Sequence, residues 1–275
     1  MIAEPAPAKI NLALHVRHRR SDGYHALETL FVFAADGDTV TVVPDTVDRF
    51  AIAGPFAAAL TGAGDNLVTR AAAAFRDRFA IAQPHAITLD KHLPIASGIG
   101  GGSADAAATL RALATLHAIA PDDPRLFVIA EALGADVPAC LLGRSTLGTG
   151  KGEALLPVDG LAGMPLLLVN PGVAVSTAAV FARWDGVDRG GIAEDGDLLA
   201  RALAGRNDLQ LPAMAIAPVI AEVLALLDAA AGVRLARMSG SGATCFALFD
   251  TMEARDAAGA LAAARGWWTL ATMLT

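Results

Sequence analysis

The chain of 275 residues contains few of the residue types that mark secreted, disulfide-built proteins. Its two cysteines, Cys140 and Cys245, stand between apolar neighbours, and this setting predicts buried free thiols in a reducing compartment. Aromatic residues make up only 5% of the chain, with a single tyrosine, and three of the 21 basic residues are lysines. Because lysine and tyrosine are so rare, each one that is present carries information.

The chain also lacks the features of nucleic-acid-binding and membrane proteins. Its formal net charge is −7, whereas binding to nucleic acids or anionic membranes needs a cationic face. Residues 160–182 form the longest uncharged stretch, but Pro165 and the Asn-Pro-Gly at 170–172 interrupt it, which argues against a membrane span. The first seven residues lack the basic and apolar regions of a signal peptide. We expect a cytoplasmic protein, with no nucleic-acid, membrane or protein partner implied.

Apolar periodicity predicts strands and helices in irregular order along the chain. The expected strands lie at residues 8–18, 29–34, 38–43, 86–90, 166–169, 234–238, 244–249 and 268–273. The expected helices lie at residues 66–80, 104–117, 124–133, 177–184, 218–231 and 253–264. This order favours the α+β class over a doubly wound sheet. A glycine-containing stretch at 148–152 suggests two domains, residues 1–155 and 156–275, and residues 183–196 predict a surface loop.

The most informative segment is a glycine loop, residues 94–103, which leads into an alanine-rich helical stretch. It has four glycines in five positions, Gly98, Gly100, Gly101 and Gly102, and it ends at Ser103, an expected helix N-cap. A loop of this kind directs several backbone N–H groups and the positive end of a helix dipole at one point. The segment therefore predicts a phosphate-binding site.

Two common nucleotide-binding motifs do not match this loop. A Walker A loop ends in Gly-Lys-Ser/Thr, and no lysine follows the glycines here. A dinucleotide-binding motif needs an acidic residue at a strand end about twenty residues further on, whereas Asp122 and Asp123 stand between two prolines. A glycine turn needed only for packing remains the structural alternative.

Together with its flanks, the loop resembles the phosphate-binding motif of the GHMP kinases, small-molecule kinases that include galactokinase, homoserine kinase and mevalonate kinase. It reads Pro94-Ile-Ala-Ser-Gly-Ile-Gly-Gly-Gly-Ser103. The N-terminal family motif stands at residues 7–12 as Pro-Ala-Lys-Ile-Asn-Leu, and the C-terminal motif at 239–246 as Ser-Gly-Ser-Gly-Ala-Thr-Cys-Phe. The last motif has two open interpretations, a second phosphate contact or a simple hairpin turn.

Further strings resemble one branch of these kinases, whose acceptor carries a cytidine diphosphate. They are Asp-Gly-Tyr-His at 22–25, Asp-Asn-Leu at 65–67, Gly-Ala-Asp-Val-Pro at 134–138, Asn-Pro-Gly-Val at 170–173 and Asn-Asp at 207–208. They follow the family order over nearly the whole chain. The resemblance implies the two-domain GHMP-kinase fold, with the active site in the cleft between the domains, and transfer of phosphate from ATP to an alcohol.

The resemblance also implies which residues carry the chemistry. Asp136 would take the proton of the acceptor hydroxyl, and Lys9 would keep that carboxylate ionised and stabilise the attacking oxygen. Local alternatives are a helix N-cap for Asp136, followed by Pro138, and a solvated strand lysine for Lys9. Asn11 lies on the same strand face as Lys9, at a spacing of two residues.

Binding of the two substrates is implied for other positions. The expected ATP-binding residues are Pro94, Ser97, Gly98, Gly100, Gly101, Gly102, Ser103 and Asn66. The expected residues for the cytidine-bearing substrate are Asn11, Tyr24, His25, Thr177 and Phe181, with Tyr24 and Phe181 on the two faces of the base and His25 hydrogen-bonded to it. The structural alternatives are turn packing for Tyr24 and His25, a core position for Phe181 and a helix N-terminal role for Asn66.

The expected cofactors are ATP and Mg²⁺, because phosphoryl transfer needs the charge of the phosphates neutralised. The metal ligands are not evident from the sequence, although Ser103 is a candidate, and a carboxylate cage is not visible. Two alternative functions remain: another GHMP kinase of the homoserine or mevalonate type, and a ligand-binding member of the fold without catalysis.

Overall fold

The computed structural model describes residues 1–60 and 66–275, so Asp65 of the Asp-Asn-Leu string lies outside the described residues. The chain forms two compact units, each assembled from separate segments. The first unit consists of Met1–Ala8, Asp36–Ile95 and Gly100–Gly143. The second consists of Lys9–Ala35, Ala96–Ile99 and Arg144–Thr275. Among the described residues, no helix is both long and apolar enough to cross a bilayer.

This division differs from two domains that meet once at residue 155. Two strands, β1 (Ile2–Arg19) and β2 (His25–Pro44), contribute residues to both units, and the short segment Ala96–Ile99 of the glycine loop belongs to the second unit. Strand β2 replaces the two expected strands at 29–34 and 38–43. It runs on through Gly37, where a Cβ atom would lie 2.1 Å from the Ala6 carbonyl oxygen. Glycine at this position therefore permits a close backbone approach instead of a turn.

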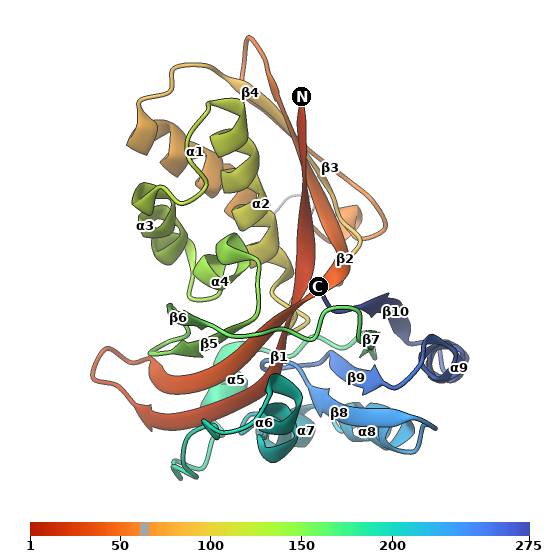
Figure 1. Cartoon of the computed structure of the whole chain (residues 1–275). Coiled ribbons are helices and arrows are strands. Elements are labelled where there is room, and N and C mark those ends of the chain that lie inside the picture. The colour runs from red at the N-terminus through yellow and green to blue at the C-terminus, as the bar shows by residue number, and fades with distance from the viewer. Residues whose placement is uncertain (61–65) are drawn as a thin grey trace. The chain divides into compact units, whose positions relative to one another are not determined.

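The described residues of the first unit form four strands, four α-helices and a short 3-10 helix, η1 (Ala57–Leu60). Strand β4 (His85–Asp90) pairs antiparallel with β2 and parallel with β3 (Arg49–Ala53), and β1 pairs with β2. The helices are α1 (Leu67–Phe79), α2 (Gly101–Leu116), α3 (Pro124–Leu133) and α4 (Val137–Leu142). They pack against one another, as the upper part of Figure 1 shows. Helix α2 buries ten of its 16 residues, and its alanines at 104, 106–108, 112 and 114 let neighbouring helices approach closely.

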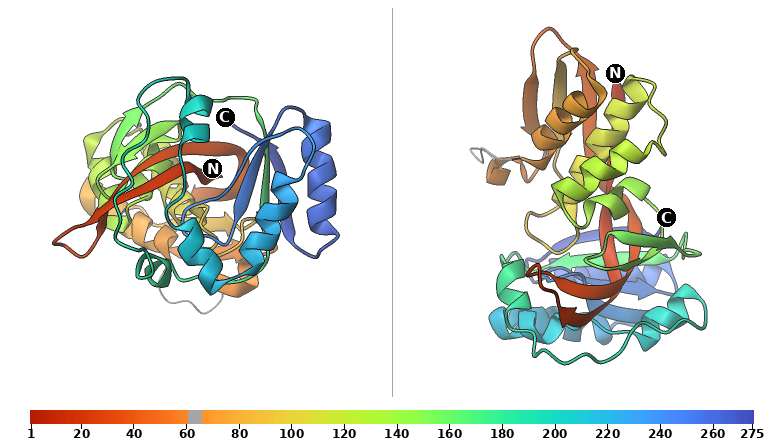
Figure 2. Two further views of the ribbon diagram at one scale, coloured as in Figure 1. Left: turned by 90° about the horizontal axis from the view of Figure 1, so that it is seen from below. Right: turned by 90° about the vertical axis from the view of Figure 1, so that its left-hand side faces the viewer.

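In the second unit, a four-stranded antiparallel sheet has the order β10-β7-β9-β8. Its strands are β7 (Pro165–Asn170), β8 (Val233–Met238), β9 (Cys245–Phe249) and β10 (Trp268–Met273). Helices α8 (Val219–Asp228) and α9 (Met252–Ala263) pack against this sheet and against each other (Figure 2). The apolar spacing Ile220, Val223 and Leu227 gives α8 one buried face, as expected for an amphipathic helix.

The remaining elements of the second unit are short. A hairpin of β5 (Thr146–Thr149) and β6 (Ala154–Pro157) belongs to the six-stranded sheet that also contains β1–β4, and it joins that sheet through pairing of β5 with β2. Three short helices follow: α5 (Thr177–Phe181), α6 (Leu198–Ala204) and α7 (Gln210–Ile216). The expected surface loop at 183–196 has no regular structure, although an ion pair from Arg17 to Asp188 ties it to β1. Cys140 and Cys245 are buried and unpaired by disulfides, as predicted.

The start of α2 corrects one prediction. The helix begins at Gly101 with Gly100 as its N-cap, so Ser103 lies inside the first turn and is not the cap. Gly100 adopts a left-handed conformation with φ +66°, which L-residues with a side chain rarely adopt. The glycines thus let the helix begin three positions earlier than a side-chain cap at Ser103 would allow.

Candidate active site

Lys9 and Asn11 lie on one face of β1, inside the second unit. The Lys9 Nζ donates to Asn11 Oδ1 at 2.9 Å, and Asn11 Nδ2 donates to Thr29 Oγ1 at 2.7 Å. Both side chains are 2% exposed, and the Lys9 ammonium lies 5.2 Å from the centre of the Phe31 ring. Most basic residues of this chain are arginines, whereas Lys9 carries a compact ammonium charge. Its hydrogen bond to Asn11 fixes the position of that charge. The solvated-strand alternative for Lys9 is therefore wrong, because the side chain is buried and hydrogen-bonded.

The C-terminal glycine motif packs on Gly98 of the glycine loop. Ser239 Oγ donates to the Gly98 carbonyl oxygen and accepts from the Asn11 backbone N–H, both at 3.1 Å. A Cβ atom on Gly98 would lie 2.6 Å from the Ser239 carbonyl oxygen and 2.7 Å from that of Gly242. Thr244 N donates to the Ser97 carbonyl oxygen at 3.0 Å. The motif therefore joins β8 to β9 and also supports residues 97–98, an arrangement that neither sequence interpretation included.

Thr177 is the first residue of α5 and contacts the same motif. Its Oγ1 shares a hydrogen bond of 2.8 Å with Ser241 Oγ. Ser176 caps the helix by accepting from Ala179 N at 3.4 Å. Because Ser176 supplies the cap, the Thr177 hydroxyl is available for its hydrogen bond to Ser241 of the glycine motif.

The expected base-binding residues form a partial aromatic cluster in the second unit. The His25 ring stacks on Phe181 with ring centres 4.8 Å apart, and the edge of Trp184 meets His25 at 5.6 Å. Burial, with a smaller effect of the nearby Arg19 charge, lowers the pKa of His25 below its usual value. The imidazole is therefore neutral at pH 7, and one ring nitrogen can donate while the other accepts.

Tyr24, which precedes His25 in the sequence, lies at the surface of the second unit. Its side chain is 57% exposed, and the Lys151 ammonium lies 5.0 Å from the ring centre. The Tyr24 backbone N–H donates to Asp22 Oδ1 at 3.1 Å, an Asx turn that sets the direction of residues 24 and 25. An exposed tyrosine beside a lysine suits a contact with a ligand better than it suits a core position.

The first turn of α2 supplies the expected phosphate-binding groups of the first unit. Within the described residues, no side chain caps this turn, and its first hydrogen bond runs from Ala104 N to the Gly100 carbonyl oxygen at 2.8 Å. The N–H groups of Gly101, Gly102 and Ser103 therefore have no acceptor inside the helix. This geometry is the one that binds anions at helix N-termini.

Two other expected site residues of the first unit lie at helix starts. Asn66 is the N-cap of α1, and its Oδ1 accepts from Val68 N at 2.9 Å, so the structural alternative for this side chain is correct. Asp136 occupies the N-cap position of α4, but its carboxylate makes no capping hydrogen bond in the described chain. The alternative interpretation of Asp136 as a helix N-cap is therefore correct for its backbone position. It is not correct for its side chain, which makes no capping hydrogen bond.

Metal-binding side chains do not gather in the described part of the chain. Residues 1–60 and 66–275 hold no group of three or more His, Cys, Asp or Glu side chains that could bind a metal ion. The Ser103 hydroxyl, one turn into α2, is the expected single ligand from the protein. This donor set fits a Mg²⁺ ion held mainly by phosphate oxygens and water.

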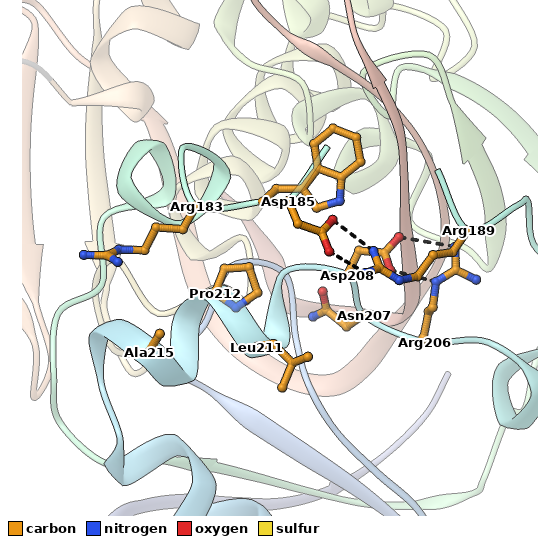
Figure 3. A pocket seen from close by; sticks show the side chains of 10 residues that line it. Arg183, Asp185, Arg189, Arg206, Asn207, Asp208, Leu211, Pro212 and Ala215 are labelled. Atoms are coloured by element: carbon orange, nitrogen blue, oxygen red, sulfur yellow. Dashed lines mark hydrogen bonds and ion pairs between the residues drawn. The ribbon is translucent and has the colours of Figure 1, made fainter. Parts of the chain in front are cut away.

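A cavity of about 510 Å³ opens in the second unit (Figure 3), and Trp184 is one of its lining residues. Its wall holds two ion pairs, Arg206 with Asp208 at 2.7 Å and Arg189 with Asp185. Figure 3 shows both carboxylates turned toward these arginines. Arg183 also lines the cavity, so the wall carries three arginines and two aspartates, and it adjoins the His25 cluster through Trp184.

Comparison with known proteins decides the family. The model of the GHMP kinase N-terminal domain matches residues 66–144, and that of the GHMP kinase C-terminal domain matches residues 189–266. These two segments cover more than half of the chain. The chain belongs to the GHMP kinase family. This GHMP kinase is 56% identical, over 98% of its length, to a 4-diphosphocytidyl-2-C-methyl-D-erythritol kinase of Rhizorhabdus wittichii, 94% of which is covered.

Other relatives of this GHMP kinase agree with that match. A protein of the same name from Sphingopyxis alaskensis is 50% identical, with 97% of this chain and 96% of the relative covered. A crystal structure of a 4-(cytidine 5'-diphospho)-2C-methyl-D-erythritol kinase superposes with a TM-score of 0.85 at 34% identity, over 99% of both chains. The crystal structure of a homoserine kinase from Cytophaga hutchinsonii is 20% identical and has a TM-score of 0.72, and the match covers 100% of this chain and 94% of that chain. The two proteins share the fold. The predicted family and the predicted α+β GHMP-kinase fold are confirmed.

Sequence reasoning missed several residues that shape this site. Ser239 and Thr29 position Asn11, and Trp184 contacts His25. Asp38 and Asp105 flank the rare Lys91 beneath the start of α2. The rarity of lysine could have singled out Lys91, and a lone acid among alanines at 104–108 could have singled out Asp105.

Proposed function

We propose that this GHMP kinase transfers the γ-phosphoryl group of ATP to the 2-hydroxyl of 4-diphosphocytidyl-2-C-methyl-D-erythritol, a step of non-mevalonate isoprenoid precursor synthesis. The observation that carries the proposal is the identity of 50 to 56% over nearly the whole chain to kinases named for that substrate. In the transfer, the hydroxyl oxygen bonds to the γ-phosphorus while the bond to the β-phosphate oxygen breaks. ADP leaves, and the hydroxyl gives up its proton.

In the proposed mechanism, Asp136 accepts this proton and Lys9 stabilises the oxygen as negative charge develops. The two residues belong to different units of the chain, and their joint action is inferred from the family motifs. What supports it locally is that the Asp136 carboxylate is not used as a helix cap and that Asn11 fixes the Lys9 ammonium. A carboxylate is a weak base, but it suffices in a loose phosphoryl-transfer transition state.

We assign the triphosphate to the glycine loop. The N–H groups of Gly101, Gly102 and Ser103 would bind phosphate oxygens, while Pro94, Ser97, Gly98 and Gly100 set the path of the loop. Asn66 would contact the nucleotide through its amide nitrogen, since its oxygen accepts from Val68 N. Mg²⁺ would neutralise charge on the phosphates, with the Ser103 hydroxyl as its protein ligand.

The cytosine ring would lie beside His25 in the same layer over the Phe181 ring, with Tyr24 covering its other face. Neutral His25 can both donate and accept, which matches the neighbouring donor and acceptor groups on the edge of cytosine. Asn11 and Thr177 lie beside Ser239 and Ser241 of the glycine motif, where they would contact the polyol or its diphosphate. No protein, nucleic-acid or membrane partner is needed for this reaction, and it would take place in the cytoplasm.

Tyr24 offers a direct check of the base-binding cluster. Replacing Tyr24 with alanine removes one stacking face, which is worth about 1–3 kcal/mol per base. We expect KM for the cytidine-bearing alcohol to rise about 5- to 150-fold, with KM for ATP changed less than about twofold. Tyr24→Phe keeps the ring and serves as the matched control. If Tyr24 acted only on folding, steady-state kinetics with either substrate varied would show a lower apparent kcat and no change in either KM value.

The function itself is tested by an ADP-release assay with three acceptors: the cytidine-bearing alcohol, homoserine and mevalonate. The proposal expects ATP-dependent turnover with the first acceptor and a kcat/KM at least about 10³-fold lower with the others, because the base-binding residues would stay unpaired. Turnover of homoserine or mevalonate at a comparable kcat/KM would support another kinase of the family. Tight ATP binding without any turnover would support a non-catalytic member.

A further inference from the structure

The cavity that Trp184 lines has no part in the proposed reaction. Its volume of about 510 Å³ is in the range of small-molecule sites, and its lining residues all belong to the second unit. Within the described chain, Tyr24, His25 and Phe181 are not among these lining residues. Trp184 belongs to the cavity wall and also meets His25 with its edge. The cavity is therefore a separate space that shares one side chain with the expected base-binding cluster.

Part of the cavity wall is apolar. Leu211, Pro212 and Ala215 come from α7, and the Trp184 ring adds an aromatic surface. The Leu211 side chain is 74% exposed, so a ligand that lies over α7 would remove apolar surface from water. In the view of Figure 3, Pro212 stands between the Arg183 side chain and the two ion pairs of the wall. This surface suits the apolar body of a ligand whose polar group faces the charged part of the wall.

The acceptor groups of the wall are already bound by the protein. Each of its two aspartates accepts from an arginine and from a backbone N–H group. Asp208 accepts from Arg206 at 2.7 Å, and Asp185 accepts from Arg189. The side-chain amide of Asn207 makes three hydrogen bonds with backbone groups. These side chains therefore hold the wall together, and a ligand would have to bind to other groups.

The groups of the wall that remain unpaired are both donors. The Trp184 Nε1–H group is buried and has no hydrogen-bond partner among the described residues. The exposed Arg183 guanidinium makes neither an ion pair nor a side-chain hydrogen bond within the part of the chain that the structure describes. A buried N–H group without an acceptor is costly, and proteins seldom leave one. With three arginines against two aspartates, the wall also carries one positive charge in excess.

We propose that this cavity is a second binding site, and that it takes a small aromatic carboxylate. The carboxylate supplies the acceptor that the Trp184 N–H group lacks, and its single charge compensates the excess charge to which Arg183 contributes. The aromatic body covers Leu211 and Pro212 of α7. The site goes beyond the proposed function, because the transfer of phosphate to the acceptor alcohol does not use it.

The test uses benzoate as the probe and benzamide as its neutral counterpart of the same shape. In protein labelled with nitrogen-15, the three tryptophans give three indole N–H signals in the NMR spectrum, and Trp184→Phe identifies the signal of Trp184. If that variant does not fold, Trp267→Phe and Trp268→Phe identify the other two signals. Benzoate should shift the Trp184 signal saturably, with a dissociation constant of about 1 mM or lower. Benzamide should bind at least about fivefold more weakly.

Three further variants locate the bound probe. Arg183→Gln removes the excess positive charge of the wall and should raise the dissociation constant of benzoate at least about threefold. Arg144→Gln changes an exposed arginine of the same unit that is not a lining residue, so it is the matched control and should bind benzoate as the wild type does. Tyr24→Ala alters the base-binding cluster instead, and there the dissociation constant should stay within about twofold of the wild-type value.

Each way in which the proposal can fail gives a different result. A Trp184 signal that does not respond to about 20 mM benzoate would overturn the binding site, since the N–H group is then satisfied by solvent. Equal dissociation constants for benzoate and benzamide would overturn the assignment of a carboxylate. Weaker binding in Tyr24→Ala with no change in Arg183→Gln would place the probe in the base-binding cluster and overturn the second site. All these titrations are made without ATP or the acceptor, so a failure of the proposed function does not affect them.

Discussion

Replacing Asp136 with asparagine is expected to lower kcat by about 10²- to 10⁴-fold, the usual contribution of a positioned general base. The amide keeps the size and the hydrogen-bonding reach of the carboxylate but cannot accept the proton. The urea unfolding midpoint of the variant is measured alongside, so that a lower kcat is compared between equally folded proteins. Single-turnover kinetics would show the loss in the chemical step, with the dissociation constant of ATP nearly unchanged.

Asp123 provides the matched control for this change. It stands before a proline at the start of α3, as Asp136 does at the start of α4, and its carboxylate does cap its helix by accepting from Arg125 N at 2.9 Å. Asp123→Asn should therefore leave kcat within about twofold of the wild-type value, because asparagine is as good an N-cap as aspartate. Full activity of Asp136→Asn would remove Asp136 from the chemical mechanism.

Adding a single methyl group at Gly98 is expected to disrupt the support of the glycine loop. A Cβ atom there would lie 2.6–2.8 Å from backbone atoms of Ser239 and Gly242, and Gly98 has φ +78°. Backbone atoms cannot rotate away as a side chain can, so either the loop or the β8–β9 connection must move. We expect Gly98→Ala to lower the free energy of unfolding by about 3 kcal/mol or more and to weaken ATP binding.

Gly163 separates the steric effect at Gly98 from the cost of its backbone conformation. Gly163 has a similar φ of +82°, lies in the same unit, and has no atom within 4 Å of the position of an added Cβ. Gly163→Ala should therefore cost only the left-handed backbone strain, about 1–2 kcal/mol, without an effect on ATP binding. Equal losses in the two variants by urea unfolding would contradict a steric role for Gly98.

How much of the site could be predicted depends on how far apart in the sequence the interacting residues lie. The glycine loop, Lys9 and Asp136 were identified from local motifs, and the family they indicate is confirmed. The contact of Ser239 with both Asn11 and Gly98 joins segments more than 140 residues apart, and no local pattern encodes such pairing. The predicted roles of the site residues in binding and catalysis stay predictions.

Glycine accounts for two of the differences between the predicted and the observed elements. The first turn of α2 begins at Gly101 because Gly100, as the N-cap residue, adopts a left-handed backbone conformation. Any of several neighbouring glycines can adopt it, so the sequence does not show where the helix begins. Gly37 was compatible with a turn, but in the structure it lets β2 pass close to Ala6 without a break. Helices α6 and α7, with seven residues each, are too short for periodicity to reveal them against a loop.

Product analysis tests the central claim most directly. The wild-type protein is incubated with Mg·ATP and 4-diphosphocytidyl-2-C-methyl-D-erythritol, and the products are followed by phosphorus NMR together with ADP formation. The proposed function predicts one new phosphomonoester on the 2-oxygen of the erythritol, formed in equal amount with ADP and absent with Asp136→Asn on the same time scale. ADP release without that phosphomonoester, or a phosphomonoester at another oxygen, would contradict it.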